Sequence, residues 1–252
     1  MTARFKVLLR LWLVLPPLLA AATSAQGQGP DRAGARGAGL TRAEGTAYEL
    51  YAVGVGFGVA ILPRDWTRGA QQLRLQAGLG RSGRVLATGS VSAAGSVRLS
   101  LPPSVPTPLR VDALNAPPLP EGVTRECSGQ LRSSDGAASF TEGHLVFGDG
   151  EPLFPLRSTE DLLDYDYRNS LSGFLIYADR ATTISGERSC IFTDPQGEDP
   201  FMLRERWKDV SLVRGWNALR QAVVTAASPA QADSTLTAIP SPAAWFAFEK
   251  RR

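Results

Sequence analysis

Short runs of alternating apolar and polar residues, separated by glycine-containing turns, are the feature that most limits the folds open to this 252-residue chain. In residues 72–77 the apolar side chains share one parity and the polar side chains take the other. The same alternation recurs at 96–102 and 108–114. A period of two is typical of strands that bury one face. The pattern therefore predicts an all-β fold built from many short strands.

Turn signals stand between these runs. They are Ala94-Gly95, Asp135-Gly136, Gly148-Asp149-Gly150 and Arg214-Gly215. Glycine and Asp-Gly tolerate the backbone angles of tight turns. Together with 25 Gly and 18 Pro in the chain, these turns predict one or more antiparallel β-sandwiches. Helix content is expected to be one or two short helices at most, and residues 158–161 are the best candidate because they form a capping box.

The C-terminal half contains further strand signals. Residues 170–190 are interpreted as a hairpin of two strands turned at Asp179-Arg180, where both charged residues occupy a corner. Residues 218–227 are interpreted as a strand because of two adjacent valines, and 243–249 supply a last apolar strand. Residues 228–242 are interpreted as a loop, in which two apolar residues leave room for a short strand.

The chain divides into five segments by composition. Residues 1–25 are predicted to be a signal peptide and 26–46 a flexible leader rich in Gly, Ala and Arg. A β-sandwich-like domain at 47–116 and a second β-domain at 121–250 are expected on either side of a Pro-rich linker at 117–120. The alternative is a single split sandwich.

The N-terminus has the layout of a secretory signal peptide. Arg4, Lys6 and Arg10 precede an apolar stretch of 12 residues, Leu11 to Ala22, and small residues follow up to Ala25. The stretch is shorter than the roughly 20 residues that a spanning helix needs. We expect cleavage near Ala25, a secreted or periplasmic protein, and no transmembrane segment in the mature chain.

The charge balance argues against polyanionic partners. The whole chain holds 27 Lys and Arg against 24 Asp and Glu, and three of the basic residues lie in the predicted signal peptide. The mature chain would then be formally neutral. We therefore expect no nucleic-acid partner. An envelope protein or a glycan remains open as partner.

The two cysteines, Cys127 and Cys190, are predicted to form a disulfide. An even pair in an exported chain favours a structural bridge. Closing a loop of about 60 residues would contribute roughly 3–5 kcal/mol in the chain-entropy model. His144 is the only histidine, so a metal site built on the cysteines is disfavoured.

Acidic residues gather in one segment of the second half. Glu160, Asp161, Asp164, Asp166 and Asn169 supply the oxygen ligands that Ca²⁺ prefers. Their spacing departs from the calcium-loop motif, and a solvated helix and turn is the favoured interpretation. No cofactor is predicted.

Other candidate sites are weaker. The glycine cluster 54–58 lacks the spacing of a dinucleotide fingerprint and is interpreted as a strand with close backbone approach. Four of the five tryptophans, at 66, 207, 216 and 245, could serve a binding platform, but their positions favour packing. His144 lies in a strand-like run without a catalytic motif around it, so an enzyme is disfavoured.

The order of these signals resembles that of exported bacterial β-sandwich proteins of unknown function. The segments concerned are LPRDW, GSVSAAGSVRLSLP, CSG, GFLIYAD and RGWNAL. The GSVSAAGSVRLSLP segment also resembles the strand–turn–strand units of carboxypeptidase-regulatory-like modules. This resemblance implies a non-catalytic sandwich and assigns no catalytic residue.

We therefore expect an exported, non-enzymatic protein with a structural or binding role in the cell envelope or outside the cell. Two alternatives stay open. One is an extracellular hydrolase that uses carboxylates or His144. The other is an extracellular module stabilised by Ca²⁺ at 160–169.

Overall fold

The fold is known from a computed structural model. It describes residues 39–55, 58–77, 83–114, 122–157, 169–193, 200–225, 231–240, 242 and 244–248. Within these ranges the chain is almost entirely β-strand, with no α-helix and a single 3-10 helix, η1 (Val111–Ala113). The all-β prediction is therefore confirmed for the described residues. The candidate helix at 158–161 lies outside them.

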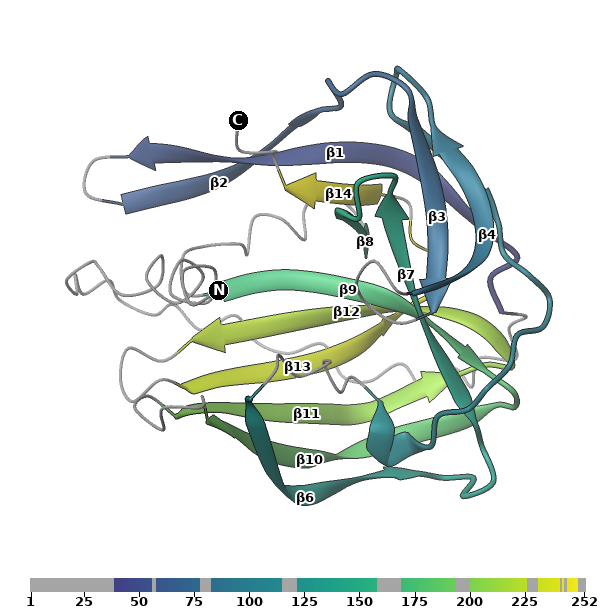
Figure 1. Cartoon of the computed structure of the whole chain (residues 1–252), viewed down its shortest axis with the longest axis vertical. Helices are drawn as coiled ribbons and strands as arrows, with labels where there is room; N and C mark the ends of the chain where they lie inside the picture. Colours follow the sequence, from purple (N-terminus) through teal and green to yellow (C-terminus); the bar gives the residue numbers. More distant parts are fainter. Residues whose placement is uncertain are drawn as a thin grey trace, which may run out of the picture.

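Seven strands close into a ring. They are β1 (Arg42–Val55), β3 (Gln71–Ala77), β4 (Arg84–Val91), β5 (Ser96–Ser100), β7 (Phe140–Phe147), β8 (Pro152–Leu156) and β14 (Ala244–Phe248). Around the ring the order is β3-β4-β5-β1-β14-β8-β7, and β7 pairs back onto β3. β14 pairs parallel to β1 and antiparallel to β8. The result is a closed β-barrel, seen in the upper part of Figure 1.

The barrel interior holds the first hydrophobic core. Inward-facing aliphatic side chains come from all seven ring strands and surround the fully buried Trp245. Residues from the neighbouring sheet, among them Tyr177 and Trp216, extend this core. Tyr177 donates to the Pro103 carbonyl at 3.1 Å, and Trp216 donates to the Pro102 carbonyl at 2.9 Å. The segment after β5 is thereby held against this core.

Six further strands extend the sheet from β7. They are β9 (Asn169–Ala178), β12 (Gly215–Thr225), β13 (Gln231–Ile239), β11 (Phe201–Leu212), β10 (Thr182–Thr193) and β6 (Thr124–Ser133), in that spatial order. Figure 1 shows this extension curving below the barrel. Its inner face carries a second core, which includes Phe174, Ile184, Trp207 and Leu236, and which Leu114 beside η1 helps to cover.

One strand lies off this path. β2 (Gly58–Asp65) pairs only with β1, as an antiparallel hairpin whose outer end projects to the left of the barrel in Figure 1. Of the glycine cluster, residues 54 and 55 lie in β1 and 58 in β2, with 56 and 57 outside the described residues. The strand interpretation of this cluster is confirmed for the residues that are described.

Several local predictions are corrected. Residues 108–114 are not a strand but contain η1, because the Arg110 carbonyl accepts a turn hydrogen bond from Ala113. The predicted loop 228–242 contains the nine-residue strand β13, which pairs on both sides. The last residues of the predicted leader belong to β1, which begins at Arg42 and pairs with β5.

Three of the predicted turns do not join hairpins. Asp135-Gly136 lies between β6 and β7, which are not neighbours. β9 and β10 are both strands, as predicted, but β9 pairs with β7 and β12 whereas β10 pairs with β6 and β11. The turn at 214–215 likewise separates β11 from β12, which are not neighbours. By contrast, Gly95 at the β4–β5 turn and Gly150 at the β7–β8 turn have positive φ and do join paired strands. The turns were predicted correctly, but strand pairing across a turn is confirmed only for the β4–β5 and β7–β8 hairpins among the described strands.

The domain division stays a prediction. The proposed linker 117–120 lies outside the described residues. The closed ring takes strands from both sides of it, since β3 pairs with β7 and β1 pairs with β14. The barrel and the extension form one continuous hydrogen-bonded sheet.

Candidate functional site

The two cysteines form the predicted disulfide. Cys127 lies on β6 and Cys190 on β10, directly opposite each other in the antiparallel register, with their Cα atoms 4.1 Å apart. Cys190 faces the second core and is 6% exposed, whereas Cys127 is solvent-exposed. The bridge spans 63 residues of sequence. It ties β6 to β10, its one neighbour among the strands that the structure describes.

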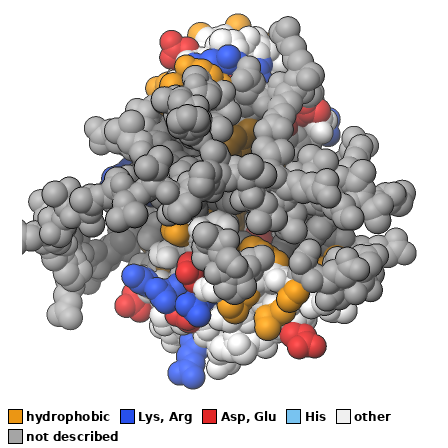
Figure 2. All heavy atoms as spheres, turned by 90° about the vertical axis from the view of Figure 1, so that its left-hand side faces the viewer, with side chains coloured by type: hydrophobic (Ala, Val, Ile, Leu, Met, Phe, Trp, Pro, Cys, Tyr) orange, Lys and Arg blue, Asp and Glu red, His pale blue; other side chains and the backbone are white. Residues whose placement is uncertain are grey.

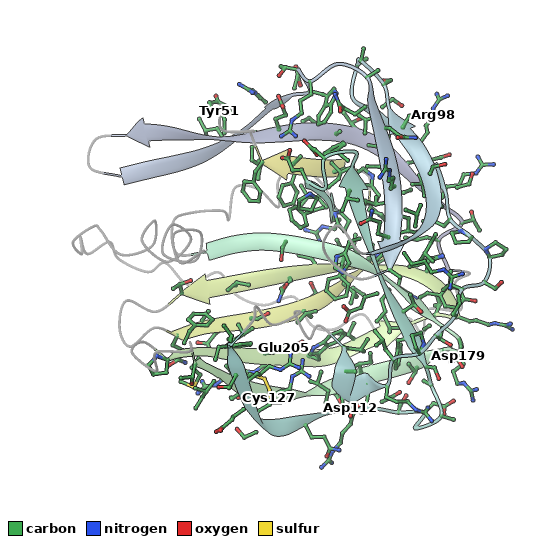
Figure 3. The ribbon with its side chains drawn as sticks, viewed as in Figure 1. Tyr51, Arg98, Asp112, Cys127, Asp179 and Glu205 are labelled. Atoms are coloured by element: carbon green, nitrogen blue, oxygen red, sulfur yellow. A yellow bond between two sulfur atoms is a disulfide. The ribbon has the colours of Figure 1, made fainter. Side chains whose placement is uncertain are left out.

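A buried ion pair lies on the same inner face, two residues before Cys190. Arg188 donates through Nη2 to Glu205 Oε2 on β11 at 2.6 Å, and the two side chains are 10% and 3% exposed. Trp207 donates its indole N–H to the other oxygen of Glu205. Figure 3 shows Glu205, Asp112 and Cys127 in the same part of the molecule. Burial without such partners would cost several kcal/mol per charge.

Arg188 also fastens the segment that covers this core. Its Nη1 donates to the Asp112 carbonyl at 2.6 Å, and its Nη2 donates to the Leu114 carbonyl at 2.7 Å. These carbonyls lie in and just after η1. The guanidinium therefore links β10, β11 and the η1 segment. This geometry makes Arg188 a clamp rather than an acid or base.

Polar side chains continue across the inner face toward β9. Ser234 on β13 lies opposite Glu205 and is 1% exposed. Gln221 on β12 donates to Ser234 Oγ at 2.8 Å and accepts from Ser172 on β9 at 3.0 Å. A row of polar side chains thus crosses five neighbouring strands. The hydrogen bonds in this row form two groups, one joining β10, β11 and η1 and the other joining β13, β12 and β9, and each group fixes the relative position of its own elements.

A second buried charge closes one end of the barrel core. Glu49 on β1 accepts hydrogen bonds at Oε2 from Thr67 and, at 3.1 Å, from Arg64 Nε, and it accepts one at Oε1 from Arg68 Nε. Arg68 also pairs with Glu151 at 2.6 Å and stacks over the rings of Trp66 and Phe147. Burial alone would raise the pKa of Glu49. The hydrogen bonds from Thr67 and Arg68, with the charges of Arg68 and Arg64, outweigh burial and lower it.

Replacing Glu49 with glutamine is expected to reduce stability at neutral pH by about 2 kcal/mol, because the hydrogen bonds to a charged group are lost. In the wild type, the lowered pKa means that the unfolded state takes up the proton first as pH falls below about 4.5. The stabilisation from Glu49 is therefore present above this pH and declines as the pH falls further. Urea unfolding at pH 7 and pH 3.5 measures both effects.

A matched control lies on the same strand. Glu44 pairs with Arg42 at 3.4 Å in an exposed position, so Glu44→Gln is expected to change stability by less than about 0.5 kcal/mol. Equal losses of unfolding free energy in the two variants would contradict the role given to Glu49. So would a Glu49→Gln variant whose stability falls between pH 7 and pH 3.5 as much as that of the wild type.

His144 is a buried residue on β7. Its ring packs 5.8 Å from that of Phe174, and its Nε2 has no hydrogen-bond partner among the described residues. Burial lowers its pKa from 6.5 to about 4. The imidazole is therefore neutral at neutral pH. The position matches the packed-residue interpretation more closely than that of a general base poised near neutral pH.

Acidification is expected to destabilise the protein through His144. The unfolded chain binds a proton near pH 6.5 and the folded chain only near pH 4, so stability is complete above pH 6.5 and is lost as pH falls between these values. The linkage relation gives a loss of about 2 kcal/mol from pH 7 to pH 5. In urea unfolding, the stability of His144→Phe should change less between pH 7 and pH 5 than that of the wild type. If the stability of the variant fell equally steeply, the pH dependence would come from other residues.

Asp179 and Arg180 stabilise the turn after β9 through a hydrogen bond and ion pairs. Asp179 accepts the backbone N–H of Ser139 at 3.0 Å, and Arg180 bridges Asp179 at 3.3 Å and Asp135 at 3.6 Å. Burial would raise the pKa of Asp179, but the Ser139 hydrogen bond and the Arg180 charge lower it. Figure 3 places Asp179 at the end of the extension opposite to the projecting hairpin.

The four tryptophans are packed rather than displayed. All are buried, and each indole N–H donates to an oxygen, at the Gly69, Pro102 and Glu44 carbonyls and the Glu205 carboxylate. The packing interpretation of Trp66, Trp207, Trp216 and Trp245 is confirmed. They do not form a common exposed platform.

The acidic segment proposed for Ca²⁺ is not tested. Glu160, Asp161, Asp164 and Asp166 lie outside the described residues, and Asn169 opens β9. Within the described part of the chain, no group of three or more His, Cys, Asp and Glu side chains is arranged to hold a metal ion. The same part contains no helix long and apolar enough to cross a membrane.

Charged side chains on the outer face of the extension pair with one another. Arg204 and Arg206 both approach Glu187, at 3.3 and 2.9 Å, and Arg204 also approaches Asp233 at 3.6 Å. Figure 2 shows described basic and acidic side chains next to one another rather than in a patch of one sign. Comparison of the chain with protein-family models, curated proteins and solved structures finds no match.

Proposed function

We propose that this chain is an exported β-protein with a structural or binding role in the cell envelope or outside the cell. The observation that carries the proposal is the disulfide between Cys127 and Cys190. Disulfides form and persist mainly in oxidising compartments, which the predicted signal peptide at 1–25 would give access to.

The placement of the ionisable groups supports a role other than catalysis. Glu49, Glu205 and Asp179 all accept hydrogen bonds from arginines, and these contacts hold strands or covering segments together. Arg188 donates hydrogen bonds to the Asp112 and Leu114 carbonyls and so holds the η1 segment in place. The resemblance of residues 89–102 to units of non-catalytic carboxypeptidase-regulatory-like modules agrees with this interpretation.

The nature of the partner follows from the surface. The mixed charge of the outer face of the extension favours a neutral or weakly charged partner, such as an envelope protein or a glycan, over a polyanion. Among the described strands, β2 and β6 each pair on one side only, and edge strands of this kind can pair with extended polypeptides.

The test combines localisation with intact mass. The full chain, expressed with a C-terminal tag, is fractionated into cytosol and envelope or medium, and its mass is measured with and without reductant and a thiol label. We expect an exported chain that begins near residue 26 and takes up two labels only after reduction. A variant that lacks residues 2–25 serves as control and should stay in the cytosol. A wild-type chain found in the cytosol at full length would overturn the proposal.

A second measurement addresses catalysis and binding together. Crosslinking in native envelopes, followed by affinity capture, is expected to recover a defined partner with the wild type. His144→Ala should leave that capture unchanged. A hydrolytic activity of the purified protein that disappears in His144→Ala would favour the hydrolase alternative instead.

A further inference from the structure

The strand β6 is held to the molecule by unusually little packing. Among the described strands it is the outermost of the extension and pairs with β10 alone. Seven of its ten residues are solvent-exposed, and Leu131 is the one that is buried. Strands with few buried apolar contacts open at lower free energy than the rest of a fold. The disulfide therefore reinforces a strand that is otherwise held mainly by its backbone pairing with β10.

We propose that the Cys127–Cys190 bridge is a thiol–disulfide exchange site that a dithiol can open in the folded protein, releasing β6 from the sheet. This goes beyond the proposed function, because it concerns a change of state after folding. The proposed exchange requires a cysteine that the reductant can reach and a reductant. It also requires that breaking the bridge opens β6 without unfolding the rest of the protein. The dithiol class, of which dithiothreitol is the simplest probe, supplies the reductant.

Cys127 is the more exposed of the two cysteines. This residue is solvent-exposed on the edge strand, whereas Cys190 faces the core. A thiolate of the dithiol would attack Cys127 Sγ, forming a mixed disulfide and breaking the bond to Cys190 Sγ, which leaves as thiolate and takes a proton from water. The second thiol of the reductant then attacks its own sulfur in the mixed disulfide. Cys127 leaves as a thiolate and is protonated, while the dithiol is oxidised to its disulfide.

The difference in exposure between the two cysteines favours this direction. Cys127 is solvent-exposed, whereas Cys190 is 6% exposed, so an attacking thiolate reaches Cys127 more readily than Cys190. The exchange is thus expected to be directed, with the mixed disulfide formed at Cys127 rather than at Cys190.

The consequence is local because β6 takes no part in the barrel ring. The ring closes through β3 and β7, and the rest of the extension keeps its pairing through β10 and β11. Loss of β6 would uncover Leu131 and the side of η1 that contacts β6. Opening the bridge would therefore expose part of the second core and leave the first intact.

Hydrogen exchange under native conditions tests this. The wild-type protein is incubated with or without dithiothreitol, exchanged in deuterated buffer, and analysed as peptides. We expect protection in 124–133 to fall about ten-fold or more, with protection in 71–77 and 140–147 unchanged. A parallel sample treated briefly with limiting glutathione and quenched with acid should carry the adduct on Cys127.

Two variants sharpen the result. Cys127→Ser with Cys190→Ser should show the exchange of the reduced wild type without reductant. Ser128→Ala with Ser189→Ala changes the neighbouring cross-strand pair and keeps the bridge, so it should respond to dithiothreitol as the wild type does. Resistance to reduction without denaturant would overturn the proposal. So would an adduct on Cys190, unchanged protection in 124–133, or loss of protection in the barrel strands.

Discussion

Replacing Glu205 with alanine is expected to lower the free energy of unfolding by about 3–5 kcal/mol, the usual effect of removing one partner of a buried ion pair. The variant would leave the guanidinium of Arg188 buried without its carboxylate and would remove the acceptor of the Trp207 N–H. Urea unfolding, followed by tryptophan fluorescence, measures the loss.

The matched control is an ion pair on the opposite face of the same strands. Glu187 pairs with Arg206 at 2.9 Å, but both side chains are more than 40% exposed. Glu187→Ala is therefore expected to cost less than about 1 kcal/mol. Similar losses in the Glu187 and Glu205 variants would contradict the clamp described for Arg188.

A double-mutant cycle identifies the partner. If Glu205 acts chiefly through Arg188, then Glu205→Leu combined with Arg188→Met should cost less than the sum of the single changes, with a coupling of about 0.5–3 kcal/mol. The double variant should still be less stable than the wild type, because the Asp112 and Leu114 carbonyls lose their donor. Additive losses would mean that the two residues act independently.

The strands were predictable because their signal is local. Alternation in 72–77 and 96–100 located β3 and β5, and the glycines at 95 and 150 located two hairpin turns. Strand pairing is not local. Nothing in the sequence around β14 indicates that it pairs with β1, which begins about 200 residues earlier. The closure of the barrel was therefore beyond an argument from periodicity.

The 108–114 segment shows where periodicity misleads. Its apolar residues alternate as in a strand, but the segment crosses over the second core instead of joining a sheet, and the Arg110 carbonyl starts a 3-10 turn. Only a single bridge, from Leu109 to Phe140, is β-like. Alternation with a period of two predicts which side chains share a face. It does not predict whether the backbone has a partner strand.

The buried charges were missed, although a signal for one of them exists. Glu205 has the parity of Trp207, while Arg204, Arg206 and Lys208 take the other. A single carboxylate on the apolar parity of a strand predicts a buried charge that needs a partner. The partner, Arg188, lies on another strand, so its identity again depended on pairing that the sequence does not reveal.

Truncating Trp245 to alanine is expected to cost about 3–5 kcal/mol, as is usual for deleting a large buried aromatic side chain. Trp245 is fully buried at the centre of the barrel core, on the strand that joins β1 to β8. Its indole also donates to the Glu44 carbonyl of β1 at 3.0 Å. For a chain of this size, such a loss would lower the melting temperature by roughly 10 °C or more.

Two comparisons separate volume from hydrogen bonding. Trp245→Phe keeps most of the apolar volume and loses the donor, so it should cost less than Trp245→Ala, with about 1 kcal/mol due to the hydrogen bond. Val85→Ala removes an exposed apolar side chain from the ring strand β4 and should change stability by no more than about 0.5 kcal/mol. If Trp245→Ala melted within a few degrees of Val85→Ala, β14 would not be closing the barrel, because its central side chain would then contribute no more than a surface residue.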